Sequence, residues 1–370
     1  RDGHPPNKRA KMDDEGVQAP FAHAIVAGLI VAPTFVKQIP TSLLIVATAS
    51  ATVWAGCKRS VKPVAPAETM TQSDALRFPV MGSVVLLSLF LALKYLPKEL
   101  VATVLSLYFV LLGAFAVTAC FTPTLSPFLP SNMQTKTFTL KIPKIPFLNP
   151  DGLEQAISVP EMLTGLLSLV FCAWYQRSKH FFANNLLGVC FSLQGIELLA
   201  LGSVPVGCIL LCGLFFYDIF WVFGTPVMVA VAKNVDGPIK LLFPRVAVDD
   251  DSPAFSMLGL GDIVLPGIFI ALILRYDAAK GRSLFGTAFA SYILGLGTTI
   301  YVMNAFKAAQ PALLYIVPAV LGGTLGHALL NGELKELLAF DESAPKSAPA
   351  PTAVDGAAPA PDAADGGKRD

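Results

Sequence analysis

Charged residues are scarce in this chain. Asp, Glu, Lys and Arg make up 14% of its 370 residues, whereas about a quarter is usual in soluble domains. Hydrophobic residues reach 54%. This composition predicts a membrane protein that crosses the bilayer several times. The formal net charge of +1 gives no support for nucleic acid as a partner.

Motifs for metal sites and for several classes of hydrolase are also missing. The six cysteines form no Cys-x-x-Cys pair and the four histidines are scattered, so we predict no metal site and no cofactor. Neither Gly-x-Ser-x-Gly nor His-Glu-x-x-His occurs, which disfavours a serine or zinc hydrolase.

Long apolar runs fill most of the chain, and we expect an all-α polytopic bundle of about nine transmembrane helices. The first two runs form either one broken span or a helical hairpin, which would make ten. The runs lie at about 21–36, 41–57, 78–96, 99–120, 160–176, 181–202, 207–231, 257–275, 284–306 and 311–330.

Four regions follow from this pattern. Residues 1–19 are polar and expected to be disordered, as is the Ala- and Pro-rich tail at 339–370. Residues 20–206 hold the N-terminal spans and residues 207–338 the catalytic core. The loop at 121–160 contains seven prolines, yet Phe138–Ile142 alternates with period two and predicts a small extended segment there.

Two aspartates stand within consecutive apolar runs. Asp218 lies inside LLCGLFFYDIFWVFG, and Asp262 follows Gly259-Leu260-Gly261 at the start of IVLPGIFIALIL. A single ionisable group in a membrane often serves a structural or proton-relay role. A pair points instead to two carboxylates that share one proton, one as general base for water and one protonated to polarise the scissile carbonyl. The sequence does not say which aspartate takes which part.

The two carboxylates can meet only if the first helix breaks. If that helix ran to Val231, Asp218 would lie roughly 20 Å from the helix end, against roughly 8 Å for Asp262 if its helix starts at Met257. Pro226 removes a helical donor and disfavours helix at the residue before it. We therefore predict a helix end or sharp kink at Gly224–Pro226, with both aspartates near the 232–256 loop.

Small residues and a proline surround the predicted site. Gly259 and Gly261 would let a substrate backbone approach Asp262, although glycines at such positions also serve helix packing. An unwound substrate needs backbone partners, which strand addition to an exposed edge would supply. Pro311 makes the start of the last span a candidate non-helical segment that could help to hold such a strand. Gly322 and Gly326 suggest a helix contact face in that span.

Three motifs on late spans carry a family resemblance: Phe216-Tyr217-Asp218, Gly259-Leu260-Gly261-Asp262 and Gln310-Pro311-Ala312-Leu313. They resemble the GxGD-type intramembrane aspartyl proteases, which include presenilin, and within that group the signal peptide peptidase family. The similarity runs from about Ser60 to Leu338.

The resemblance implies a nine-span hydrolase of the endoplasmic reticulum membrane, with a lumenal N-terminus and a cytosolic C-terminus. Lysine and arginine are too evenly distributed over the loops to decide this orientation themselves. The implied substrates are remnant signal peptides and other type II-oriented transmembrane helices, cut within the lipid bilayer. Only 43 residues (219–261) separate the two aspartates, which argues against the long insertion of presenilin and for a single-chain enzyme. A homo-oligomer is left open.

The same resemblance assigns roles to individual residues. Asp218 and Asp262 map onto the catalytic aspartates. The residues expected to bind or position the substrate are Tyr217, Gly259, Leu260, Gly261, Gln310, Pro311, Ala312 and Leu313.

Two other classes of function remain as alternatives. One is an ion-coupled transporter with paired carboxylates, although the internal symmetry typical of transporters is missing. The other is a catalytically weak or inactive adaptor that binds transmembrane helices in membrane protein quality control. Retention of both aspartates argues against the adaptor.

Overall fold

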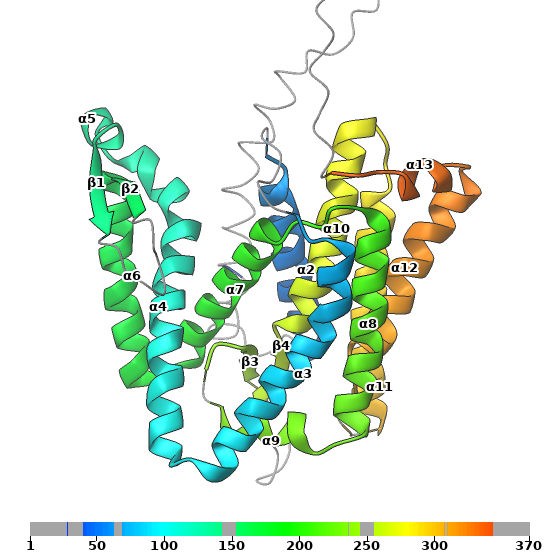
Figure 1. Ribbon diagram of the computed structural model, residues 1–370, viewed down its shortest axis with the longest axis horizontal. Helices are drawn as coiled ribbons and strands as arrows, with labels where there is room; N and C mark the ends of the chain where they lie inside the picture. Colours follow the sequence, from blue (N-terminus) through cyan, green and yellow to red (C-terminus); the bar gives the residue numbers. More distant parts are fainter. Residues whose placement is uncertain are drawn as a thin grey trace, which may run out of the picture.

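The computed structural model describes residues 28, 40–62, 69–142, 153–235, 237–244, 255–306, 308 and 310–342 (Figure 1). The predicted first span at 21–36 and the predicted disordered segment at 1–19 lie outside these residues, as does most of the tail. The helices are α2 (Thr41–Ser60), α3 (Gln72–Tyr95), α4 (Lys98–Leu125), α5 (Ser131–Gln134), α6 (Val159–Ser178), α7 (Phe181–Leu198), α8 (Val204–Phe223), α9 (Val227–Asn234), α10 (Gly261–Lys280), α11 (Phe285–Phe306), α12 (Leu313–Leu330) and α13 (Leu334–Leu338).

Five of these helices are long and apolar enough to cross a membrane: α3, α4 with the short 3₁₀ helix η1 (Ser126–Phe128) that follows it, α8, α11 and α12. Four more described helices, α2, α6, α7 and α10, have at least 18 residues, but each is either too polar or too charged to count as a candidate span. The predicted mostly helical membrane bundle is therefore present in the described residues, whereas the count of nine spans is not confirmed.

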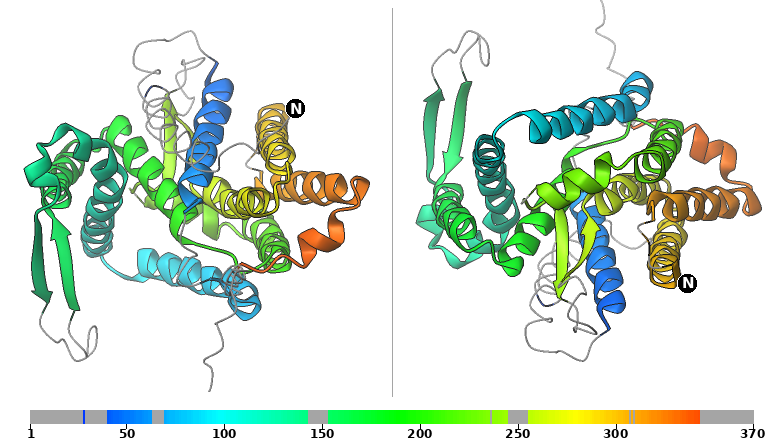
Figure 2. Two further views of the ribbon diagram at one scale, coloured as in Figure 1. Left: turned by 90° about the horizontal axis from the view of Figure 1, so that it is seen from above. Right: turned by 90° about the horizontal axis from the view of Figure 1, so that it is seen from below.

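Helix α10 lies at the centre of the bundle, where α2, α7, α8, α11 and α12 pack against it (Figures 1 and 2). Helices α4 and α6 form an outer pair beside α7, and α3 packs on α8 and α9. The main hydrophobic core surrounds α10. A second, smaller core lies between α3, α4, α8 and α9. Its buried residues include Phe109 of α4, Trp221 of α8 and Val231 of α9, and side chains of α3 pack against them.

Two antiparallel hairpins accompany the helices. Strands β1 (Thr137–Ile142) and β2 (Leu153–Ser158) pair with Thr137 opposite Ser158, which confirms the extended segment predicted at 138–142. Strands β3 (Lys240–Pro244) and β4 (Phe255–Gly259) pair with Lys240 opposite Gly259. The sequence did not predict this second hairpin, because its strand β4 was included in the helical run at 257–275.

Helix ends follow from local sequence. Thr71 caps α3 and Ser158 caps α6, each in a reciprocal capping box with an acidic residue three positions later. Helix α10 ends at Gly281, whose φ of 69° favours glycine.

The predicted break between the aspartate motifs is confirmed. Helix α8 ends at Phe223 and α9 begins at Val227, with Pro226 at its N-cap. A Cβ at Gly224 would lie 2.5 Å from the Phe220 carbonyl oxygen, so only glycine fits this turn without a shift.

The predicted contact face at Gly322 and Gly326 is wrong for the described residues. A Cβ at either position would meet nothing within 4 Å among them. Gly323 is the glycine that packs closely, against Ser291 of α11.

Candidate active site

Asp218 is positioned on α8 by the helix break that follows it. The residue lies five positions before the end of α8 at Phe223, roughly 8 Å along the helix axis. Its side chain is buried and its Oδ2 accepts a hydrogen bond of 3.0 Å from the backbone N–H of Leu313. The first residue of α12 is thereby tied to the aspartate of α8.

Asp262 lies in the first turn of α10, directly after the β3–β4 hairpin. The helix begins at Gly261, not at Met257 as assumed for the depth argument, because residues 255–259 form strand β4. The Asp262 backbone carbonyl accepts a hydrogen bond of 3.2 Å from the buried Tyr292 hydroxyl of α11. Asp218 therefore stands near the C-terminal end of α8, and Asp262 at the N-terminal end of α10, which directly follows the hairpin.

The structure brings the two aspartates together. Helices α8, α10 and α12 pack against one another, and the carboxylates lie near enough for their charges to interact. Two carboxylates in such a setting do not both ionise readily, so they can hold one proton between them.

The glycines of the motif leave space beside Asp262. A Cβ at Gly259 would lie 3.4 Å from Asp262 Oδ2, and one at Gly261 would meet only Leu265, at 3.7 Å. Leu260 is held in place instead: its N–H donates to the Ile239 carbonyl over 3.1 Å, and its side chain packs towards Gly188 of α7. The motif thus combines a fixed leucine with two open positions.

The segment from Gln310 to Leu313 lies late in the sequence but reaches Asp218 in the structure. Gln310 and Pro311 are not helical and α12 begins at Leu313, in agreement with the non-helical start predicted at Pro311. The Ala312 carbonyl accepts a hydrogen bond of 3.4 Å from the Thr299 hydroxyl. The side-chain oxygen of Gln310 accepts one of 3.3 Å from Tyr315.

Tyr217 lies next to Asp218 in sequence but points towards α3. Its ring would lie 3.5 Å from a Cβ at Gly82, and it stacks obliquely with Trp221. Its contacts in the structure are therefore with the α3 side of the bundle.

Sequence reasoning missed what holds the hairpin in place. The side-chain amides of Asn184 and Asn185, on α7, donate to the carbonyls of Lys240 and Leu242, each over 2.7 Å. The Asn185 side-chain oxygen also accepts from the Leu242 N–H over 2.7 Å. Polar side chains within an apolar run commonly bond to a neighbouring helix. One bond of that kind exists, from the Tyr175 hydroxyl to Asn184, but both residues chiefly anchor β3.

In the described part of the chain, β4 has an open edge, since no strand pairs with it on the side away from β3. The Asn185 side chain bonds both the N–H and the C=O of Leu242, so these two backbone groups point away from β4. Leu242 pairs with Met257, and in an antiparallel pair of this kind the N–H and C=O of both residues point outward. The backbone groups of Met257 therefore point away from β3. Met257 is 48% exposed. The asparagines thus occupy the outer edge of β3, whereas β4 presents backbone groups just before the Gly259–Asp262 motif.

Among the described residues, no group of three or more His, Cys, Asp or Glu could hold a metal ion.

Comparison with known proteins gives a consistent result. The family model described as signal peptide peptidase, Peptidase_A22B, matches residues 62–344. The chain is 45% identical to signal peptide peptidase of Mus musculus and 44% identical to that of Homo sapiens, in both cases over 80% of this chain and 80% of the relative. It is also 49% identical to intramembrane protease 2 of Caenorhabditis elegans, over 48% of this chain and 43% of that protein.

Proposed function

This chain belongs to the signal peptide peptidase family of intramembrane aspartic proteases, and we propose that Asp218 and Asp262 are its catalytic pair. The observation that carries the assignment is their placement near the ends of two helices, α8 and α10, that pack against each other. The family relationship confirms the resemblance drawn from the sequence. It does not favour the transporter or the adaptor.

The hydrogen bond to Asp218 supports a division of roles within the pair. A backbone N–H donor favours the ionised form of a carboxylate, and the Leu313 N–H donates to Asp218 Oδ2. Asp218 would accordingly act as general base and remove a proton from the attacking water. Asp262 would carry the shared proton and donate it towards the scissile carbonyl oxygen.

The substrates we propose are transmembrane helices, in particular remnant signal peptides and type II-oriented segments. The names of the mouse and human relatives support signal peptides as substrates, and the motif resemblance suggests the type II-oriented segments. From the same resemblance we propose a location in the endoplasmic reticulum membrane, with the N-terminus lumenal and the C-terminus cytosolic. Residues 310–313, which reach the site beside Asp218, would position the substrate together with Gly259–Gly261.

Cleavage within a helix requires local unwinding, because the peptide bond is otherwise shielded by helical hydrogen bonds. The freed backbone groups then need partners inside the membrane. We propose that the unwound segment adds as a strand to the open edge of β4, because Asn185 already occupies the opposite edge of the hairpin. Strand β4 leads directly to Asp262, so a strand bound there would lie beside the carboxylates.

The catalytic pair can be tested with Asp218→Asn and Asp262→Asn in detergent-solubilised protein and a labelled signal-peptide helix. We expect each variant to lose cleavage by roughly 10³-fold or more while still binding the helix. A matched control is Asp277→Asn, on the same helix as Asp262 and roughly 22 Å away. Its carboxylate accepts from the Phe285 N–H, a bond that asparagine can also accept, and its activity should stay within a few-fold of the unmodified protein. Persistent cleavage in either site variant would refute the pair.

Strand addition can be tested with Met257→Pro, which removes the N–H that faces the open edge of β4. Loss of one hydrogen bond of about 1 kcal/mol, with added steric hindrance, should lower kcat/KM by roughly 10-fold or more. Met257→Ala, which keeps the N–H, should retain most activity. Equal activity of the two variants would rule out pairing at this edge.

A further inference from the structure

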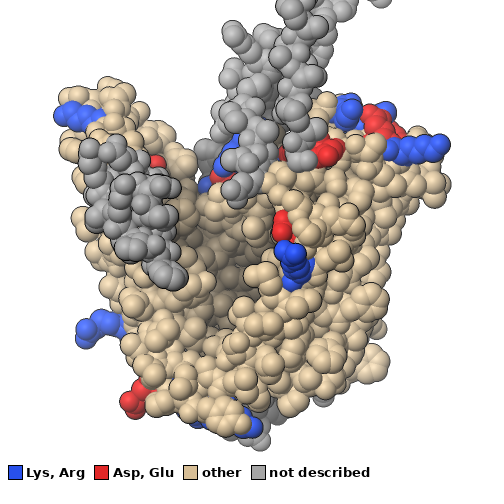
Figure 3. Space-filling model, viewed as in Figure 1, with Lys and Arg blue, Asp and Glu red and all other residues tan. Residues whose placement is uncertain are grey.

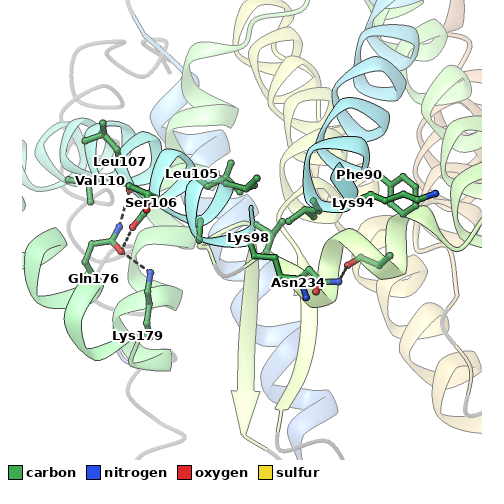
Figure 4. A pocket seen from close by; sticks show the side chains of 16 residues that line it. Phe90, Lys94, Lys98, Leu105, Ser106, Leu107, Val110, Gln176, Lys179 and Asn234 are labelled. Carbon is green, nitrogen blue, oxygen red and sulfur yellow. Dashed lines mark hydrogen bonds between the residues drawn. The ribbon is translucent and has the colours of Figure 1, made fainter. Parts of the chain in front are cut away.

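A pocket of about 770 Å³ lies away from the aspartates. It is bounded by the end of α3, the first half of α4, the end of α6 and the second half of α9 (Figure 4). None of the residues discussed for catalysis or substrate positioning lines this pocket.

The charge in the pocket is of one sign. Lys94, Lys98 and Lys179 contribute to its walls, and the described lining residues include no Asp or Glu. Lys179 donates a hydrogen bond of 2.8 Å to Gln176, which also bonds Ser106 (Figure 4). In the described part of the chain, Lys94 and Lys98 take part in no ion pair. Their charge is therefore available to an anion.

The lysines stand at the membrane surface end of the pocket. Lys94 is in the last turn of α3 and Lys98 is the first residue of α4, so both lie where two candidate membrane spans join. Basic side chains at such positions lie at the level of lipid head groups.

The remaining wall is mostly apolar, with Thr103 and Ser106 among its polar residues, and it rises into the membrane. Leu105 and Val110 on α4 lie seven and twelve residues beyond Lys98, roughly 10 and 18 Å along the helix. Phe90 lines the pocket from α3. Helices α3 and α4 diverge from their connection in Figure 1, and the surface is hollowed between them in Figure 3. The hollow can therefore admit an acyl chain from the lipid side.

We propose that this pocket is a binding site for an anionic phospholipid. The phosphate would lie between Lys94, Lys98 and Lys179, with Gln176 and Asn234 as hydrogen-bonding partners for the head group. An acyl chain would follow the apolar wall along α4. A soluble anion would use the lysines but leave that wall exposed, which is why the wall favours a lipid.

A lipid bound in this pocket would contact the segment of chain between the two aspartates. Helix α9 contributes Ala230 and Asn234 to the pocket, and Val235 directly follows the helix there. The Ala232 carbonyl of α9 accepts a hydrogen bond of 2.5 Å from Lys240 of β3. A lipid that contacts α9 would stabilise the connection between α8 and the hairpin. The binding itself does not depend on the catalytic assignment.

The test measures lipid binding to the purified full chain by native mass spectrometry and by thermal unfolding. Phosphatidylserine and phosphatidylinositol are compared with phosphatidylcholine. Inorganic phosphate is tested as a soluble anion that could compete with the lipids. We expect the anionic lipids to bind at least 10-fold more tightly than phosphatidylcholine and to raise the Tm. The double variant Lys94→Gln/Lys98→Gln should lose roughly 10- to 30-fold of that affinity, since each lysine near a membrane contributes about 1 kcal/mol.

The matched control is Lys136→Gln/Lys335→Gln, which removes the same charge from exposed lysines that do not line the pocket. It should bind anionic lipid as the unmodified protein does. Equal binding of phosphatidylcholine, equal loss in the control, or full competition by inorganic phosphate would overturn the proposal. So would a photo-crosslinker at Leu105 that captures a substrate helix and no lipid.

Discussion

Helices α10 and α3 are similar in length, 20 and 24 residues, but differ in their surroundings. Twelve residues of α10 are buried, whereas Ala75 is the only buried residue of α3. Helix α3 qualifies as a candidate membrane span, while α10, which contains Asp262, Arg275, Asp277 and Lys280, does not. The helix at the centre of the bundle thus carries more charged residues than the helix at its edge.

The comparison explains why an apolar composition identifies only some of the bundle's long helices as candidate membrane spans. A helix that faces lipid must be apolar, since hydrocarbon offers no partner for a polar group. A helix enclosed by other helices can carry polar and charged groups, because its neighbours supply the partners. The catalytic chemistry proposed for Asp262 requires the second kind of helix.

The largest effect should come from the ion pair at the other end of α10. Arg275 and Glu342 are 8% and 11% exposed and lie 2.8 Å apart. Glu342→Leu would leave the arginine buried without its carboxylate, at a cost of roughly 3–5 kcal/mol in the free energy of unfolding. The measurement is the Tm in detergent.

The control for that variant is Glu336→Leu, which breaks an ion pair with Arg282 between side chains that are 38% and 39% exposed. Its Tm should hardly change, because water screens such a pair. Equal losses in the two variants would mean that α10 is no more enclosed than the surface helices.

The next largest effect on stability should come from truncating a leucine on α10, compared with the same change on α3. Leu272 of α10 is fully buried, and Leu87 of α3 is 44% exposed. Leu272→Ala should lower the free energy of unfolding by roughly 2–5 kcal/mol, because it leaves a cavity. Leu87→Ala faces lipid or solvent and should cost much less. Reversible unfolding in mixed micelles measures both, and a larger loss for Leu87→Ala would contradict the arrangement.

A smaller effect is expected from two glycines on α11. A Cβ at Gly295 would lie 2.8 Å from the Cα of Ile316, on the backbone of α12, whereas a Cβ at Gly297 would meet no described atom within 4 Å. Gly295→Ala should cost roughly 1–3 kcal/mol in stability. It should also slow cleavage, because it displaces α12 near Leu313.

Gly297→Ala is the matched control two residues away. It should leave the stability unchanged or raise it by up to roughly 1 kcal/mol, since alanine favours the helix. If both variants behaved alike in thermal unfolding and in cleavage, close packing of α11 on α12 would not be needed for the site.

The sequence by itself determined the features that depend on near neighbours. Pro226 restricts its own backbone and that of the residue before it, so the break between α8 and α9 could be predicted from it. Period-two alternation at 138–142 identified strand β1 in the same way. The aspartate motifs and the family were also readable, because they are local patterns of residue types.

Only the tertiary structure decided how distant segments meet. Residues 255–259 form a strand and not the start of a helix, because they pair with β3, which Asn185 holds from 57 positions away. The contact between Leu313 and Asp218 spans 95 positions. Gly323 packs on α11 where Gly322 and Gly326 were expected to make contact. Backbone limits act within a few residues, whereas pairing and burial depend on whichever partner the fold places alongside.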